Sequence, residues 1–207
     1  MGLWCCASTG GVAVACRCGK WAIGMPEYAD GLVGGKSKNL AALRGELPDW
    51  IALPSSVTLP FGCFEQALNA TANSGVKKRL NAAAKKVPES AAANLALCRE
   101  AVMDLKVPKK LRKELSAAMA AAGLPAPENG ERWAQAERAL VGVWASKFND
   151  RAFYSMRKVG LDFMDLRMAV LVQRVVPARY AFVIHTTNPS TGAAPPCSAL
   201  LCCDLRH

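Results

Sequence analysis

Alanine-rich sequence with a helical spacing of apolar residues fills the middle of this chain and restricts its fold more than any other feature. Between residues 61 and 104 the pattern predicts three helices, over 61–72, 76–86 and 89–104. Pro108 suits the first turn of a further helix, and Gly123 suits its end. The middle of the chain is therefore expected to form a helical subdomain.

The spacing of apolar residues changes on either side of this subdomain. After a Pro/Gly loop at 124–130, residues 131–148 read as a buried amphipathic helix, and 151–158 as a short one. The apolar period then becomes two, which predicts strands over 168–176 and 180–186, joined by a turn into an antiparallel hairpin. With a short strand expected at 55–59, the fold class is α+β, and the helical subdomain lies between a strand–helix unit and this hairpin.

Size and composition indicate a globular chain. The 207 residues suit one ordinary domain or half of a two-lobed one, and 52% are hydrophobic against 20% charged. The longest apolar runs, 168–172 and 180–184, are far shorter than the ~20 residues of a membrane-spanning helix. We therefore expect no membrane contact.

The net charge of +10 favours anionic partners. Much of it lies in two runs, 77–86 and 106–113, within helical sequence that has few aromatic residues. Nucleic-acid binding usually adds stacking aromatics or a recognised motif, so no nucleic acid is expected. Solvated helix faces explain the two runs most simply, and a non-catalytic basic helical module that binds acidic partners stays open.

The cysteines gather at the two ends of the chain. Seven of the nine lie there: Cys5, Cys6, Cys16, Cys18, Cys197, Cys202 and Cys203. This distribution fits neither a disulfide framework nor the paired CxxC units of a zinc site, and we predict no metal ligands in this chain. Residues 1–24 are expected to be a divergent, disordered leader, with order beginning near Met25, and residues 193–207 a divergent tail.

A glycine-rich turn at 31–37 (GLVGGKS) invites a phosphate-binding interpretation. Glycines let backbone N–H groups approach phosphate oxygens, and Lys36 adds a positive charge beside a helix N-terminus. The first glycine is one residue too close for a Walker A loop, and no apolar strand precedes it. Spacing alone therefore leaves two possibilities, a phosphate site or a plain helix start capped by Ser37.

The predicted hairpin offers a second candidate site. Gln173 interrupts an apolar run and shares a strand face with Leu171 and Val175. A buried glutamine needs hydrogen-bond partners, so either a ligand contact or a sheet hydrogen bond is expected there. The next strand leads into the turn sequence NPSTG at 188–192, which could face phosphates or be a simple turn. Paired acidic residues on a strand, the usual Mg²⁺ holders, are absent.

Five sequence blocks, taken in order, resemble one known family. They are GLVGGKSKNLAAL (31–43), LPSSVTLPFGCF (53–64), VWASKFNDRAF (143–153), MAVLVQRVV (168–176) and YAFVIHTTNPSTG (180–192). The first resembles the opening of the nucleotide domain shared by pyruvate phosphate dikinase, phosphoenolpyruvate synthase and the glucan, water dikinases. The others resemble the glucan branch in particular. The resemblance covers residues 25–192, as part of an AMP/ATP-binding domain of the ATP-grasp type.

The resemblance implies an enzyme that uses ATP and Mg²⁺ to phosphorylate glucosyl units of starch in the plastid, by way of a phosphohistidine on another domain. It implies that Gly35 and Lys36 contact the ATP phosphates, that Arg151 organises the triphosphate, and that Gln173 lies near the nucleotide. The family's acidic metal-binding strand and phosphohistidine motif do not follow residue 192 here, so this chain alone is expected to be inactive. A fragment of a pyruvate-type dikinase or synthase is the alternative within the family.

Overall fold

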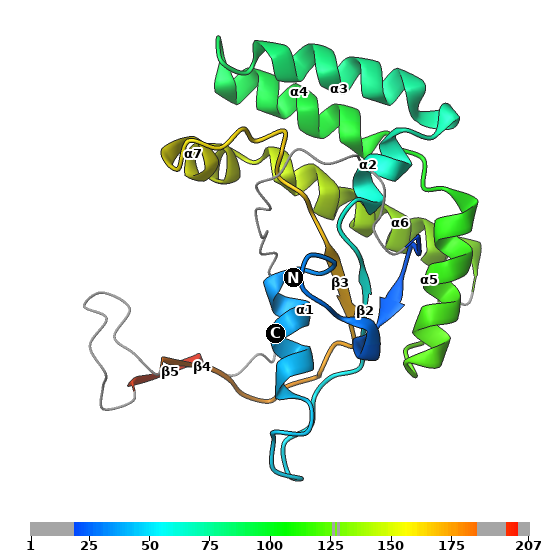
Figure 1. Cartoon of the computed structure of the whole chain (residues 1–207), viewed down its shortest axis with the longest axis vertical. Helices are drawn as coiled ribbons and strands as arrows, with labels where there is room; N and C mark the ends of the chain where they lie inside the picture. The colour runs from blue at the N-terminus through cyan, green and yellow to red at the C-terminus, as the bar shows by residue number, and fades with distance from the viewer. Residues whose placement is uncertain (1–18, 126, 128, 186–197, 203–207) are drawn as a thin grey trace. The chain divides into compact units, whose positions relative to one another are not determined.

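Residues 19–125, 127, 129–185 and 198–202 are described by the computed structural model (Figure 1). They belong to two separate units, one ending at Arg174 and one beginning at Val175. The first unit holds a small sheet and all the described helices, and the second holds a strand pair. The predicted leader at 1–24 lies mostly outside the described residues, as do most of the predicted tail at 193–207 and the turn at 188–192.

Seven α-helices and three short 3₁₀ helices are described in the first unit. The α-helices are α1 (Gly35–Leu43), α2 (Cys63–Leu68), α3 (Ser74–Lys86), α4 (Ala91–Met103), α5 (Lys109–Ala121), α6 (Gly130–Ala145) and α7 (Asp150–Lys158). The 3₁₀ helices are η1 (Met25–Glu27), η2 (Thr71–Asn73) and η3 (Ser146–Phe148). The predicted helices are confirmed, although the helix expected over 61–72 ends early, at Leu68, and a turn of η2 follows it.

A three-stranded antiparallel sheet lies in the middle of the first unit. Its order is β1 (Ile23–Gly24), β2 (Ser56–Leu59) and β3 (Val170–Gln173), with β2 in the centre. In Figure 1 the α3–α4 pair lies at the top and α1 lies beside the sheet below it. Helices together with a small antiparallel sheet confirm the α+β class.

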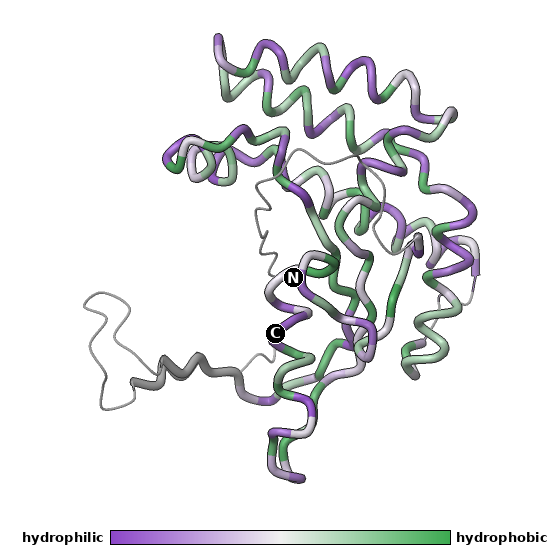
Figure 2. The backbone as a smooth tube through the Cα atoms, viewed as in Figure 1, coloured by the Kyte–Doolittle hydropathy of each residue, from purple (hydrophilic) through white to green (hydrophobic). Residues whose placement is uncertain are grey.

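The register of the strands separates the two faces of the sheet. Val57 pairs with Val172 and Leu59 pairs with Val170, and these four side chains belong to or pack on the helical core. Thr58 pairs with both Ile23 and Leu171, on the opposite face. Figure 2 shows apolar stretches where the strands lie, and alternating apolar and polar residues along α3 and α4. One face of the sheet therefore packs against the helical core, and the opposite face lies toward α1 and the glycine turn.

Aromatic side chains join the helices to one another in the core. Trp144 of α6 is fully buried, with its ring centroid 5.7 Å from that of Phe64 on α2. Phe163, in the connection before β3, lies edge-on to Phe148 and Phe153, at centroid distances of 6.2 and 5.4 Å. Edge-to-face aromatic pairs have a preferred geometry, so this packing favours one defined arrangement of the three rings over a non-directional apolar contact. The segment η3–α7 is therefore fixed against the path into β3.

The predicted hairpin between 168–176 and 180–186 is wrong. The strand β3 pairs with β2, and β4 (Ala181–His185) pairs antiparallel with β5 (Ser198–Cys202) in the second unit. A period of two identifies a strand but does not identify its partner. Here the valines of β3 continue the buried face of Val57 and Leu59, which a hairpin with β4 would not provide.

The folded part of the chain begins before the expected Met25. Trp21, Ala22 and Ile23 are buried, and Ile23 opens β1. The backbone N–H of Trp21 donates a hydrogen bond of 2.7 Å to the Glu114 carboxylate on α5. The small and apolar residues before Met25 gave no period by which to recognise this short edge strand. Among the described residues, no helix has both the length and the apolar character needed to cross a membrane.

Candidate nucleotide-binding site

The glycine-rich turn leads directly into the first turn of α1. Gly31 has φ +74°, a left-handed conformation that glycine adopts without strain, and Gly34 is the extended N-cap residue of the helix. Gly35 and Lys36 are the first two helical residues, and Lys36 is half-buried. Backbone N–H groups in the first turn of an α-helix have no acceptor within the helix itself, and they point out along its axis. The start of α1 is therefore a candidate site for an anion.

Ser37 attaches this helix start to the sheet. Its side chain is buried, and its hydroxyl oxygen lies 2.8 Å from the hydroxyl oxygen of Thr58 on β2, where either group can donate. The possibility that Ser37 caps the helix is wrong, because the N-cap is Gly34 and the Ser37 hydroxyl points to the strand. A second tie comes from the backbone N–H of Phe61, which donates to the carbonyl of Leu32 at 2.8 Å. The glycine turn is therefore held at both of its ends.

Gln173 lies at the end of β3, opposite Ser56. The register places Gln173 on the same sheet face as Thr58, which is the face that holds α1. The expectation that Gln173 is buried is wrong: its side chain is exposed, because β3 leaves the core at this residue. Ser56 is the buried member of the pair, and its hydroxyl lies 3.3 Å from that of Tyr28. The exposed amide of Gln173, on the sheet face that holds α1, is therefore accessible to a ligand.

Arg151 lies on a different element from the other three candidates. It is the second residue of α7, is exposed, and belongs to a helix that packs against α4 and η3. Figure 1 shows α7 at a distance from α1, beside the lower part of the α3–α4 pair. The structure thus brings Gly35, Lys36 and Gln173 to one face of the sheet but leaves Arg151 apart from them.

Two lysines, Lys36 and Lys38, lie near the start of α1. Lys38, one residue beyond Ser37, forms an ion pair of 2.6 Å with Asp30 in the turn. No acidic residue lies in the first turn of α1. The positive end of the helix dipole therefore adds to the Lys36 charge, and the combination favours an anion.

Neither a metal centre nor a reactive thiol is described beside these residues. Within the described ranges, no three His, Cys, Asp or Glu side chains are grouped as metal ligands. Burial raises the pKa of the Cys98 thiol to about 11, and the neighbouring Arg99 acts in the opposite direction. A neutral, buried thiol is a poor nucleophile, so Cys98 has a structural role.

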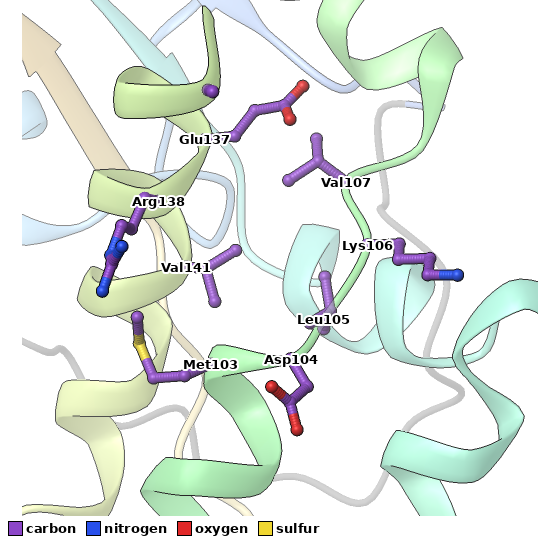
Figure 3. A pocket seen from close by; sticks show the side chains of 9 residues that line it. Met103, Asp104, Leu105, Lys106, Val107, Glu137, Arg138 and Val141 are labelled. Atoms are coloured by element: carbon purple, nitrogen blue, oxygen red, sulfur yellow. The ribbon is translucent and has the colours of Figure 1, made fainter. Parts of the chain in front are cut away.

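A cleft of about 580 Å³ lies elsewhere in the first unit (Figure 3). It separates the α4–α5 connection, from Met103 to Val107, from one face of α6. Its two acids already have cationic partners: Asp104 pairs with Arg79 at 2.6 Å, and Glu137 accepts a hydrogen bond of 2.7 Å from Arg112. None of Gly35, Lys36, Arg151 and Gln173 lines this cleft, so it is not the site that the sequence predicted.

Comparison with known proteins identifies the class. Residues 129–198 match the model of the pyruvate phosphate dikinase AMP/ATP-binding domain. The matched part runs from the start of α6 through α7 and β3, and it includes Arg151 and Gln173 but not Lys36. This part of the chain is therefore similar to a nucleotide-binding domain of the dikinase class.

Longer matches identify the branch of this class. The chain is 48% identical to the chloroplastic alpha-glucan water dikinases of Citrus reticulata and Solanum tuberosum, and 46% identical to alpha-glucan water dikinase 1 of Arabidopsis thaliana. Each match covers 84% of this chain but only 12–13% of the relative. Over 84% of its length the chain is therefore similar to alpha-glucan water dikinases, and it spans about an eighth of the length of these curated relatives.

Sequence reasoning missed how the site is supported. Ser37 and Thr58 both lie in blocks that carry the family resemblance, but nothing in either block signals that the two hydroxyls meet. Two buried hydroxyls on opposite elements become recognisable as a pair only when the strand face and the helix register are both known.

Proposed function

We propose that this chain is the ATP-binding portion of a dikinase that phosphorylates glucosyl units of starch, and that its sheet and helices form part of an ATP-grasp-like domain. One observation carries the proposal. A glycine turn and the start of α1, with Lys36 at its first turn, are fixed to the sheet by the Ser37–Thr58 contact in a chain that is 48% identical to named dikinases.

The residues divide the work of holding ATP. The N–H groups at Gly35 and the charge of Lys36 bind phosphate oxygens, and the exposed amide of Gln173 contacts the nucleotide from the same sheet face. The family resemblance also assigns Arg151 to the triphosphate; because α7 lies apart from α1, this role requires the bound nucleotide to extend from α1 towards α7. Most of what a protein contributes to phosphoryl transfer is positioning and charge stabilisation of this kind.

The transfer itself follows from the family resemblance. In this scheme the β-phosphate of ATP passes to a histidine on another domain and from there to the glucan, while the γ-phosphate passes to water. Mg²⁺ would neutralise charge on the phosphates when bound, and it is commonly held by one or two carboxylates together with the phosphates themselves. Because no cluster of ligands is found among the described side chains, we assign no residue of this chain to the metal.

Nucleotide binding is the direct test of this proposal. Titration calorimetry of the chain with ATP and Mg²⁺ is expected to give a measurable Kd, and Lys36→Ala is expected to weaken it by about tenfold, the loss of one charged hydrogen bond. Lys38→Ala is the matched control, because Lys38 lies on the same helix but already pairs with Asp30. Equal Kd values for the wild type and Lys36→Ala would remove the phosphate role of Lys36.

The acceptor is tested on the whole enzyme that contains this domain. With ATP labelled at the β-phosphate, label is expected to enter an α-glucan. Transfer of the label to pyruvate instead would favour the pyruvate-type dikinase. Since the relatives are named chloroplastic, we also propose a plastid location, which a fluorescent fusion of the whole protein would test.

A further inference from the structure

We propose that Arg99 of α4 is a positioning residue that holds Arg151 in place for the triphosphate, an inference that rests on the proposed function. Arg151 is exposed at the start of α7 and makes no ion pair in the part of the chain that is described. Where its guanidinium points therefore depends on where the first turn of α7 lies.

The first turn of α7 has no side-chain cap of its own. Its N-cap residue, Asn149, is extended and makes no capping hydrogen bond through its side chain. Arg99 contacts the residues on both sides of Asn149 instead. Its Nη1 donates a hydrogen bond of 2.7 Å to the carbonyl of Phe148 and lies 3.9 Å from a carboxylate oxygen of Asp150. One guanidinium thus fixes the Phe148 carbonyl and lies within ion-pair distance of Asp150, the residue directly before Arg151.

Arg99 is well placed for this role because its own helix is rigidly packed. Leu95, Cys98 and Val102 of α4 are fully buried, and α4 packs against both α6 and η3. The junction is held on its other side by Lys147, whose Nζ donates a 2.9 Å hydrogen bond to the carbonyl of Met164. Of these two contacts, that of Arg99 is the nearer to Arg151 in the chain.

In this proposal Arg99 affects ATP binding by fixing the position of Arg151, and it does not contact the nucleotide itself. An arginine that must first be brought into position adds an entropic cost to each phosphate contact, and a fixed first turn of α7 lowers that cost. Loss of the Arg99 guanidinium also leaves the Phe148 carbonyl without the partner that fixes it. ATP affinity should then fall, whereas AMP, which lacks the β- and γ-phosphates, should bind as before.

The test compares five variants by titration with ATP and with AMP. Arg99→Met is expected to weaken ATP binding by about tenfold, as expected for one charged hydrogen bond, and to change AMP binding by less than about twofold. The double variant with Arg151→Met should bind ATP no more than about twofold worse than Arg151→Met alone, because both changes remove the same contact. Arg79→Met is the matched control, since Arg79 pairs with Asp104 on another surface.

Arg99→Lys keeps the positive charge but lacks the planar arrangement of guanidinium donors. Its ATP affinity should lie between those of the wild type and Arg99→Met, and it replaces Arg99→Met in the test if that variant does not fold. Equal losses for ATP and AMP, or additive losses in the double variant, would overturn the inference. The inference would also fail if Arg99→Met bound ATP as well as Arg79→Met does. If Lys36→Ala and Arg151→Met bound ATP weakly in the same experiment, the proposed function would still hold. A wild-type chain that binds no ATP overturns both.

Discussion

The hydroxyl of Ser37 lies 2.8 Å from the hydroxyl of Thr58, and both side chains are buried between α1 and the sheet. This is the point at which the candidate phosphate site is attached to the rest of the fold. Because of this contact, the position of Lys36 depends on β2 as well as on α1.

Thr58→Val is expected to destabilise the chain, because it keeps the side-chain shape but leaves the Ser37 hydroxyl buried without its partner. The free energy of unfolding should fall by about 1–3 kcal/mol in urea denaturation. Adding Ser37→Ala removes the orphaned hydroxyl, so the double variant should lose less than the sum of the two single losses. Thr71→Val, at an exposed position in η2, is the control and should change stability little. Additive losses would mean that the two hydroxyls act separately.

Asn73→Ala should destabilise the helical subdomain. The buried Asn73 side chain donates to the carbonyls of Ala67 and Lys106 and accepts from the N–H of Lys106, at 2.8–2.9 Å. Loss of three bonds to backbone groups, one of them buried and two partly buried, is expected to cost about 2–4 kcal/mol, read from the denaturant midpoint. Asn81→Ala, on the exposed face of α3, is the matched control. If both variants unfold at the same denaturant concentration, the Asn73 network contributes nothing measurable.

Gly31→Ala should be destabilising, because φ at Gly31 is +74° and an alanine is strained there. The expected loss is about 1 kcal/mol of unfolding free energy. Gly75→Ala offers the opposite case within the same chain, since Gly75 lies in α3 and a Cβ there meets open space. Its expected gain is up to about 1 kcal/mol, from the helix propensity of alanine. Thermal unfolding of the two variants side by side would show the opposite signs, and shifts of the same sign would contradict the backbone argument.

Cys98 should make stability fall at high pH. Its pKa is raised from 9.0 to about 11 in the folded chain, so between these values the unfolded chain releases a proton that the folded chain keeps. This contribution is fully present below pH 9 and is lost as the pH rises through 11. In Cys98→Ala that part of the decline should disappear, which unfolding midpoints measured at pH 8 and pH 10.5 would reveal. Parallel declines in the wild type and the variant would assign the pH effect to other groups.

The helices of this chain could be predicted from its sequence, and the strand pairing could not. Apolar spacing is a local signal, and it placed α3, α4, α5 and α6 within a few residues of their observed bounds. Pairing is decided by which buried faces match, and that is how β3 pairs with β2 although β4 follows it more closely in the chain. The edge strand β1 has only two residues, too few to show any period.

The candidate site shows the same division. The glycine turn and Lys36 could be found from residue type and spacing, because phosphate binding at a helix start has a local signature. The exposure of Gln173 could not, since it depends on β3 ending there. Lys147 is the converse case: a lysine is expected at the surface, yet it is 2% exposed, with its Nζ within 6 Å of the ring centroids of Phe64 and Phe148.

The central position of β2 has a consequence for how the chain acquires its structure. Its partner β3 lies more than a hundred positions further along, and helices α2 to α7 occupy the sequence between them. The contacts within the helical segment are short-range and form quickly, whereas the closing of so long a loop is slow. A ribosome-bound chain would therefore hold a nearly complete helical bundle while one edge of β2 still waited for β3 to emerge. At that stage β2, whose Thr58 contacts Ser37 of α1, would lack one of its two partner strands. The candidate nucleotide site at the start of α1 should therefore be the last part of this unit to reach its final structure.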